Sequence, residues 1–169
     1  NRYCGRVRAD KEEAVKWCDW IAKQDIELAL MVKNVGGKAV KPVLDYTLDE
    51  VRALLETNVL GAFEMCRLAH ASLAEHGNAA IVNVGSVSGL THVRTGAPYG
   101  LAKAALHHLT RDLACEWAED CIRVNAVAPW SRRTVRTAGA LADPDDHPAA
   151  MLRPHRGHTA EPQNATTAS

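Results

Sequence analysis

Two short apolar runs, separated by a segment of helix length, place the strongest limit on how this chain of 169 residues can fold. Residues 79–84 read Ala-Ala-Ile-Val-Asn-Val, and residues 122–127 read Ile-Arg-Val-Asn-Ala-Val. Short runs of this kind, largely apolar, are typical of strands buried inside a parallel sheet. The sequence favours a long helix over 99–117, between the two runs. This alternation predicts an α/β protein with a doubly wound parallel sheet.

The segments that precede these runs continue the alternation. We expect a short strand, an amphipathic helix and a mostly apolar strand in turn, at residues 4–9, 10–23 and 26–32. Thr47 and Glu50 have the spacing of a capping box, which predicts that a helix begins there. That helix is expected to reach about residue 75.

Composition limits both the number of domains and the class of protein. One domain fits the length, and we expect it to span residues 1–137. The polar segment 138–169 has no apolar period and is expected to be irregular or disordered. The chain has 20 basic and 20 acidic residues and a net charge of zero, so nothing points to a nucleic-acid partner. No apolar run is long enough to span a membrane.

The cysteines and the N-terminus indicate a reduced, cytoplasmic protein. Five cysteines are present, an odd number, and no Cys-x-x-Cys pair occurs among them. Cys66 and Cys115 are expected to be small core residues on apolar helix faces. The first residues have no signal-peptide pattern. No metal site is expected.

Ser86 and a tyrosine–lysine pair suggest chemistry on a carbonyl or an alcohol. Tyr99 and Lys103 are four residues apart, so on a helix they share one face. Ser86 follows the apolar run at 79–84 and can reach the same point. A tyrosine hydroxyl ordinarily titrates near pH 10, about three units above neutrality, and a neighbouring ammonium stabilises its phenolate. On its own, however, a Tyr-x-x-x-Lys pair is found on many helices by chance.

Further motifs on both sides of this pair resemble the short-chain dehydrogenase/reductase family. The resemblance covers residues 7–137 and rests on the segments Val32-Lys33-Asn34-Val35-Gly36, Thr57-Asn58-Val59-Leu60-Gly61, Gly85-Ser86-Val87-Ser88-Gly89, Tyr99-Gly100-Leu101-Ala102-Lys103 and Arg123-Val124-Asn125-Ala126-Val127-Ala128-Pro129. Strings such as Leu113-Ala114-Cys115-Glu116-Trp117-Ala118 resemble the tropinone reductase-like branch. The resemblance implies a Rossmann-like fold and an oxidoreductase that interconverts a ketone and a secondary alcohol. The branch favours NADP(H), with NAD not excluded.

The resemblance also implies roles for four catalytic residues. Tyr99 would donate a proton to the substrate oxygen, and Ser86 would hydrogen-bond that oxygen. Lys103 would stabilise the phenolate and hold the nicotinamide ribose. Asn58 would position a water that relays protons, although it could instead serve only to bend its helix. Ser88 competes with Ser86, but the spacing of thirteen residues to the tyrosine favours Ser86.

The remaining family positions concern the cofactor. The cofactor-binding residues implied by the resemblance are Asp10, Asn34, Gly36, Tyr99, Lys103, Pro129 and Thr134. Asp10 could instead be a helix cap and Thr134 an ordinary loop residue. Lys33 stands where the family usually has asparagine. The pocket would accept a small or medium-sized ketone.

One family feature is missing from the sequence. The first strands and the turn Thr-Gly-x-x-x-Gly-x-Gly, whose amides bind the cofactor pyrophosphate, do not occur in these 169 residues. We therefore expect an N-terminally truncated domain with an aberrant C-terminus, in which the strand at 26–32 becomes a sheet edge. The alternative function is a catalytically inactive fragment that keeps the fold. It would pair with a second copy or a full-length relative through helices 48–75 and 99–117. Epimerase or dehydratase chemistry is a weaker third possibility.

Overall fold

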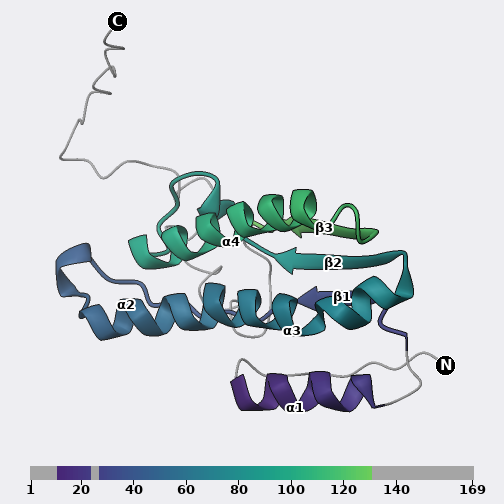
Figure 1. Cartoon of the computed structure of the whole chain (residues 1–169). Helices are drawn as coiled ribbons and strands as arrows, with labels where there is room; N and C mark the ends of the chain where they lie inside the picture. The colour runs from purple at the N-terminus through teal and green to yellow at the C-terminus, as the bar shows by residue number, and fades with distance from the viewer. Residues whose placement is uncertain (1–10, 24–26, 131–169) are drawn as a thin grey trace, which may run out of the picture. The chain divides into compact units, whose positions relative to one another are not determined.

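The computed structural model describes residues 11–23 and 27–130, and all structural statements below concern these residues (Figure 1). The helices and strands follow one another as α1 (Lys11–Ala22), β1 (Leu30–Lys33), α2 (Leu48–Leu55), α3 (Gly61–His76), β2 (Ala79–Val84), α4 (Ala97–Glu116) and β3 (Ile122–Val127). Three short turns of helix lie between them, η1 (Val43–Asp45), η2 (Glu56–Leu60) and η3 (Val87–Gly89). The strand expected at 4–9 and the tail expected at 138–169 lie outside the described residues.

The three strands form one parallel sheet in the order β1-β2-β3. Met31 of β1, Ile81 of β2 and Val124 of β3 are in register, and all three side chains are buried. The predicted strands at 79–84 and 122–127 are confirmed without a change of boundary. The predicted strand at 26–32 is shorter and later, at Leu30–Lys33, and lies at the edge of the described sheet as expected. The α/β class is confirmed.

Two helices, α3 and α4, cover the same face of this sheet. The side chains that form the core come from both helices and from all three strands: Met31, Met65, Cys66, Ala69, Leu73, Ala79, Ile81, Leu113, Trp117, Ile122 and Val124. Cys66 is buried, as predicted, but the prediction for Cys115 is wrong because its side chain is exposed. Leu113 and Trp117, two residues before and after Cys115, face the core in its place.

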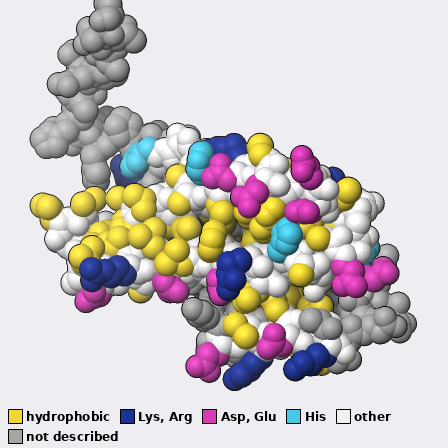
Figure 2. Space-filling model, viewed as in Figure 1, with side chains coloured by type: hydrophobic (Ala, Val, Ile, Leu, Met, Phe, Trp, Pro, Cys, Tyr) yellow, Lys and Arg dark blue, Asp and Glu magenta, His cyan; other side chains and the backbone are white. Residues whose placement is uncertain are grey.

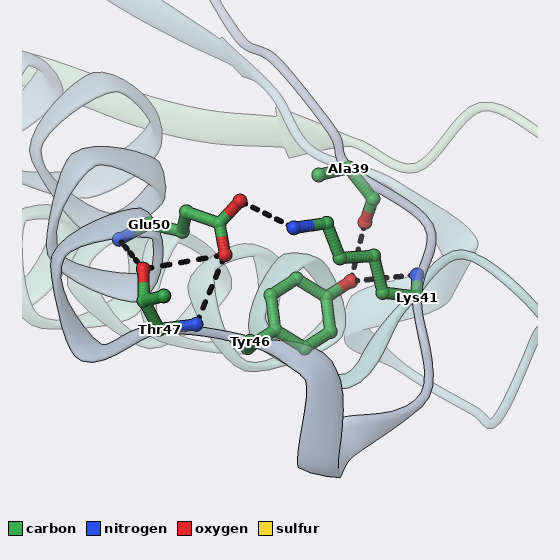
Figure 3. A network of polar contacts seen from close by, with 5 residues as sticks. All are labelled: Ala39, Lys41, Tyr46, Thr47 and Glu50. Atoms are coloured by element: carbon green, nitrogen blue, oxygen red, sulfur yellow. Dashed lines mark hydrogen bonds and ion pairs between the residues drawn. The ribbon is translucent and has the colours of Figure 1, made fainter.

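The path from β1 into α2 is fixed by a small polar network (Figure 3). The capping box is confirmed: the Thr47 hydroxyl accepts a hydrogen bond from the Glu50 amide, and the Glu50 carboxylate accepts one from the Thr47 amide. Lys41 forms an ion pair with the same carboxylate. The Tyr46 hydroxyl donates to the carbonyl of Ala39 and accepts from the amide of Lys41. The loop of residues 39–46 is therefore closed on itself beside the start of α2.

No helix among residues 11–23 and 27–130 is both long enough and apolar enough to cross a membrane.

Candidate active site

Several of the predicted site residues lie where the parallel strands end. Asn34 and Gly36 follow β1, Ser86 follows β2, and Pro129 follows β3. The carboxyl ends of parallel strands meet at one edge of the sheet, which is where ligands bind in open α/β folds. The amide of Val87, in η3, donates to the Pro129 carbonyl at 3.3 Å, so the segments after β2 and β3 are joined.

Helix α4 brings the predicted tyrosine and lysine to this edge. Pro98 occupies the first turn, where its missing N–H costs nothing, and Tyr99 follows it. Lys103 comes one turn later, and its Nζ lies 5.7 Å from the centroid of the Tyr99 ring. The same Nζ donates a hydrogen bond to the carbonyl of Val84 at 3.0 Å, two residues before Ser86. The ammonium therefore stands between the tyrosine and the end of β2.

Ser86 begins the short turn η3, which packs tightly on α4. The Ser86 Oγ accepts a hydrogen bond from the Ser88 amide at 3.1 Å. A Cβ on Gly89 would lie 2.5 Å from the carbonyl carbon of Lys103, so the turn and the helix touch backbone to backbone. The Ser88 hydroxyl bonds to the Thr95 hydroxyl at 2.5 Å. Ser88 thus uses its hydroxyl to hold the loop that follows η3. Ser86, at the start of η3, has no such side-chain bond to Thr95.

Asn58 is fully buried in η2, a single turn of π-helix that joins α2 to α3. Such turns inside helices are frequent at functional sites. The Asn58 side-chain amide donates to the carbonyls of Leu54 at 2.9 Å and Gly37 at 3.0 Å. Its Oδ1 has no hydrogen-bond partner among the described residues. The helix expected from Thr47 to about residue 75 is thus interrupted at Asn58, whose side chain ties the interruption to the loop after β1.

Gly36 brings Asn58 and Lys103 to one point. A Cβ at this glycine would lie 2.7 Å from the Asn58 Oδ1 and 3.3 Å from the Lys103 Nζ, so only glycine leaves both atoms room. Lys103 is 4% exposed, and burial lowers the pKa of its ammonium. One of its three N–H groups is donated to Val84. An ammonium beside an unpartnered amide oxygen fits a hydroxyl-rich group such as the ribose of a nicotinamide cofactor.

Lys33, which stands where the resembling family has asparagine, turns away from this point. Its Nζ donates to the Gly61 carbonyl at 2.7 Å, at the start of α3. Burial lowers the pKa of Lys33 to about 8, and the nearby thiols of Cys66 and Cys18 act in the opposite direction. Burial raises the pKa of the Cys66 thiol to about 11. This lysine therefore belongs to the contact between β1 and α3.

The other predicted cofactor-binding positions make no close contact with Lys103 or Asn58 that the described residues show. Asn34 is exposed after β1, and Pro129 is partly buried after β3. Asp10 and Thr134 lie outside the described residues. In the described part of the chain, no three His, Cys, Asp or Glu side chains gather to hold a metal ion.

Two residues near the site were not singled out as site residues from the sequence. The Tyr46 hydroxyl lies against Gly96, which precedes α4 with φ +86°, and a Cβ there would be 2.3 Å from it. His107 lies one turn after Lys103 on the buried side of α4. Its spacing of four from Lys103 could have placed it on the same face. The contact of Tyr46 with Gly96 joins residues fifty positions apart and has no local signal.

Comparisons with known proteins point to one family. The family model of the short chain dehydrogenases matches residues 3–144. A tropinone reductase homolog of Arabidopsis thaliana is 38% identical over 141 residues, which is 83% of this chain and 53% of that protein. The chain spans about half the length of the curated relatives it matches.

Solved structures of short-chain dehydrogenases superimpose on this chain as well. A protein assigned as a short-chain alcohol dehydrogenase of Sinorhizobium meliloti superimposes with a TM-score of 0.73 at 36% identity, covering 81% of this chain and 54% of that one. A second protein, assigned as an NAD(P)-dependent gluconate 5-dehydrogenase of Beutenbergia cavernae, contains bound NADP. It superimposes with a TM-score of 0.74 at 33% identity, covering 84% of this chain and 56% of that one.

Proposed function

This chain belongs to the short-chain dehydrogenase family, and we propose that it interconverts a ketone and a secondary alcohol with NADP(H) as the hydride carrier. The observation that carries the proposal is the position of the Lys103 ammonium. It lies beside the Tyr99 ring, on the Val84 carbonyl and next to Asn58 and Gly36. A cation buried among these groups is what a proton-donating tyrosine needs close to it.

Each residue has a part in the proposed reduction. The Tyr99 hydroxyl gives its proton to the carbonyl oxygen of the substrate. The Ser86 Oγ already accepts from the Ser88 amide, so its hydrogen can be donated to the same oxygen as negative charge develops there. The Lys103 ammonium stabilises the phenolate that remains. The Asn58 Oδ1 is the acceptor for a hydroxyl or water next to Lys103. A nicotinamide cofactor, when bound, supplies the hydride.

NADP(H) is the proposed cofactor because the Beutenbergia relative contains NADP. Lys103 and Asn58 would hold its ribose, and Gly36 leaves room for these two side chains to meet. Asn34, Pro129, Asp10 and Thr134 remain proposed contacts further along the cofactor. The substrate class is a small or medium-sized ketone.

An assay of ketone reduction tests this function. The chain is incubated with NADPH and a panel of ketones, and oxidation of the nicotinamide is followed by its absorbance. We expect turnover that falls by a factor of about 10² to 10⁴ in Tyr99→Phe, the usual effect of losing a general acid. NADPH affinity should fall only modestly, because Lys103 and Asn58, which would hold the ribose, are unchanged. Equal rates in wild type and Tyr99→Phe would contradict the assignment of the proton donor.

A second candidate function is pairing without catalysis. Helices α3 and α4 and the adjoining turn η2 carry large exposed apolar side chains, among them Leu60, Phe63 and Leu101. Figure 2 shows hydrophobic side chains gathered over the side of the molecule where α2 and α4 lie. Apolar patches of this kind often mark protein–protein contacts. The partner would be a second copy or a longer relative.

Sedimentation distinguishes the two candidates. Pairing without catalysis would be favoured if the chain reduces no ketone and forms a dimer that dissociates in Phe63→Glu. Reduction of a ketone, whatever the state of association, would favour the oxidoreductase. Asn78→Glu, an exposed change in the turn after α3, serves as the control for added negative charge.

A further inference from the structure

His107 is a buried histidine that none of the proposed catalytic steps uses. It lies on α4 at 8% exposure, one turn after Lys103 and two turns after Tyr99. Its ring reaches across to the end of β2, where Nε2 is 3.1 Å from the Ser86 carbonyl oxygen and 3.5 Å from the Ser86 amide nitrogen. The carbonyl is the nearer group and can only accept. We therefore assign the ring hydrogen to Nε2, which then donates it to the Ser86 carbonyl.

The residue before Ser86 is shaped to admit this ring. A Cβ on Gly85 would lie 2.4 Å from the Cε1 and 2.6 Å from the Nε2 of His107, inside contact distance. Gly85 is buried, and its amide donates to the Val127 carbonyl at 2.8 Å. The imidazole therefore occupies the volume in which any other residue at position 85 would place its side chain.

The histidine completes a series of bonds that fixes three successive residues. The Val84 carbonyl is held by Lys103, the Gly85 amide by Val127, and the Ser86 carbonyl by His107. The Ser86 carbonyl also accepts from the amide of Gly89 at 3.0 Å, so both of its lone pairs are used. The peptide that carries Ser86 is thereby held against rotation.

We infer that His107 is a positioning residue that sets the Ser86 hydroxyl at the reacting oxygen by holding the Ser86 carbonyl. This inference rests on the proposed ketone reduction for its catalytic consequence, but the bond itself exists independently of turnover. A displacement of about 1 Å at a reacting group can cost about 10²-fold in rate. Loss of the bond should therefore lower kcat while KM for the ketone changes little.

Four variants separate positioning from simple packing. His107→Leu keeps much of the volume and loses the donor, whereas His107→Gln keeps an N–H group at a similar reach. His108→Leu, an exposed change at the next position, is the matched control. We expect kcat to fall about 10- to 100-fold in His107→Leu and to stay within a few-fold of wild type in His107→Gln and His108→Leu. In a Ser86→Ala background, His107→Leu should cause no further loss, because the histidine acts through the serine.

A second measurement does not depend on activity. Amide hydrogen exchange of Ser88 and Gly89, whose amides bond to Ser86, reports how firmly Ser86 is held. We expect exchange to rise by about tenfold in His107→Leu, the effect of losing one net hydrogen bond. It should be unchanged in His107→Gln and His108→Leu.

The kinetic and the hydrogen-exchange measurements can fail independently, so the inference about His107 and the proposed ketone reduction are tested separately. A chain that reduces no ketone, yet shows the exchange pattern, would overturn the reductase and leave the positioning bond standing. Unchanged exchange in His107→Leu would overturn the inference. So would equal kcat losses in His107→Leu and His107→Gln, or a loss in the Ser86→Ala background as large as in wild type.

Discussion

Strands β1 and β2 lie side by side in one sheet, yet they are held very differently. β2 is paired on both sides, and Ala79, Ile81 and Asn83 on it have no exposed surface. β1 pairs with β2 alone among the described residues. Its Met31 faces the core, but on the other face Leu30 and Val32 are 56% and 57% exposed, whereas their partners Ala80 and Val82 on β2 are partly buried. Within the described residues, the half of the site built on β2 is thus fixed by packing on both sides, whereas the half that follows β1 depends on a single strand partner.

The largest expected effect comes from truncating one aliphatic side chain on each strand, Ile81 on the core face and Leu30 on the opposite face of the sheet. Ile81→Ala should lower the free energy of unfolding by about 2–5 kcal/mol, because it leaves a cavity in the core. Leu30→Ala should cost less than about 1 kcal/mol, because more than half of the side chain is already in water. Urea unfolding of the three proteins measures both values. Similar losses would show that β1 is held as firmly as β2 and would break the comparison.

The pH dependence of stability tests how firmly the end of β1 is buried, because Lys33 lies there. Its pKa is lowered by burial from 10.5 to about 8, so between these pH values the unfolded chain binds more protons than the folded one. Stability therefore rises with pH across this window. At about 1.36 kcal/mol per pKa unit, the gain of wild type relative to Lys33→Met should approach about 3 kcal/mol as an upper limit.

The matched control for this effect is Lys38→Met, at an exposed position in the following loop. It should show no such trend with pH. The Cys66 thiol, whose pKa burial raises to about 11, opposes the trend in every variant, and taking differences between variants cancels most of it. If stability relative to Lys33→Met were flat from pH 8 to 10.5, the burial of Lys33 would be ruled out.

The smallest effect is expected at the cap of α2, beyond β1. Thr47→Ala removes the acceptor of the Glu50 amide and should cost about 1 kcal/mol. Thermal unfolding measures the change, with Thr91→Ala, an exposed loop threonine, as the control. A loss as large as that of Ile81→Ala would mean that the loop of residues 39–46 holds β1 in place, contrary to the comparison.

Most of the fold could be predicted from the sequence because its signals are local. The apolar runs at 79–84 and 122–127 set two strands, and the spacing of Thr47 and Glu50 sets a helix start. The face of a helix is harder to read, as Cys115 shows. Its neighbours are apolar, but the rotation of α4 turns Leu113 and Trp117 to the core.

The site could be predicted only in part. The family resemblance implied that Asn58, Ser86, Tyr99 and Lys103 belong to one site. In the structure Asn58 and Lys103 meet at Gly36 after β1, and Lys103 also bonds to the Val84 carbonyl at the end of β2. The ring of His107 over Gly85 and the unpartnered oxygen of Asn58 arise from packing between distant segments, which leaves no periodic signal. The catalytic roles themselves remain proposals.

A calorimetric titration of the folded chain with NADPH, with NADH alongside, tests the central claim most directly. The account predicts saturable binding of NADPH in the micromolar range, weakened at least about tenfold in Lys103→Met, because the ammonium would lose its hydrogen bonds to the ribose. Binding must occur without the glycine-rich turn that the sequence lacks. No heat of binding from a folded sample would contradict the oxidoreductase and favour pairing through α3 and α4.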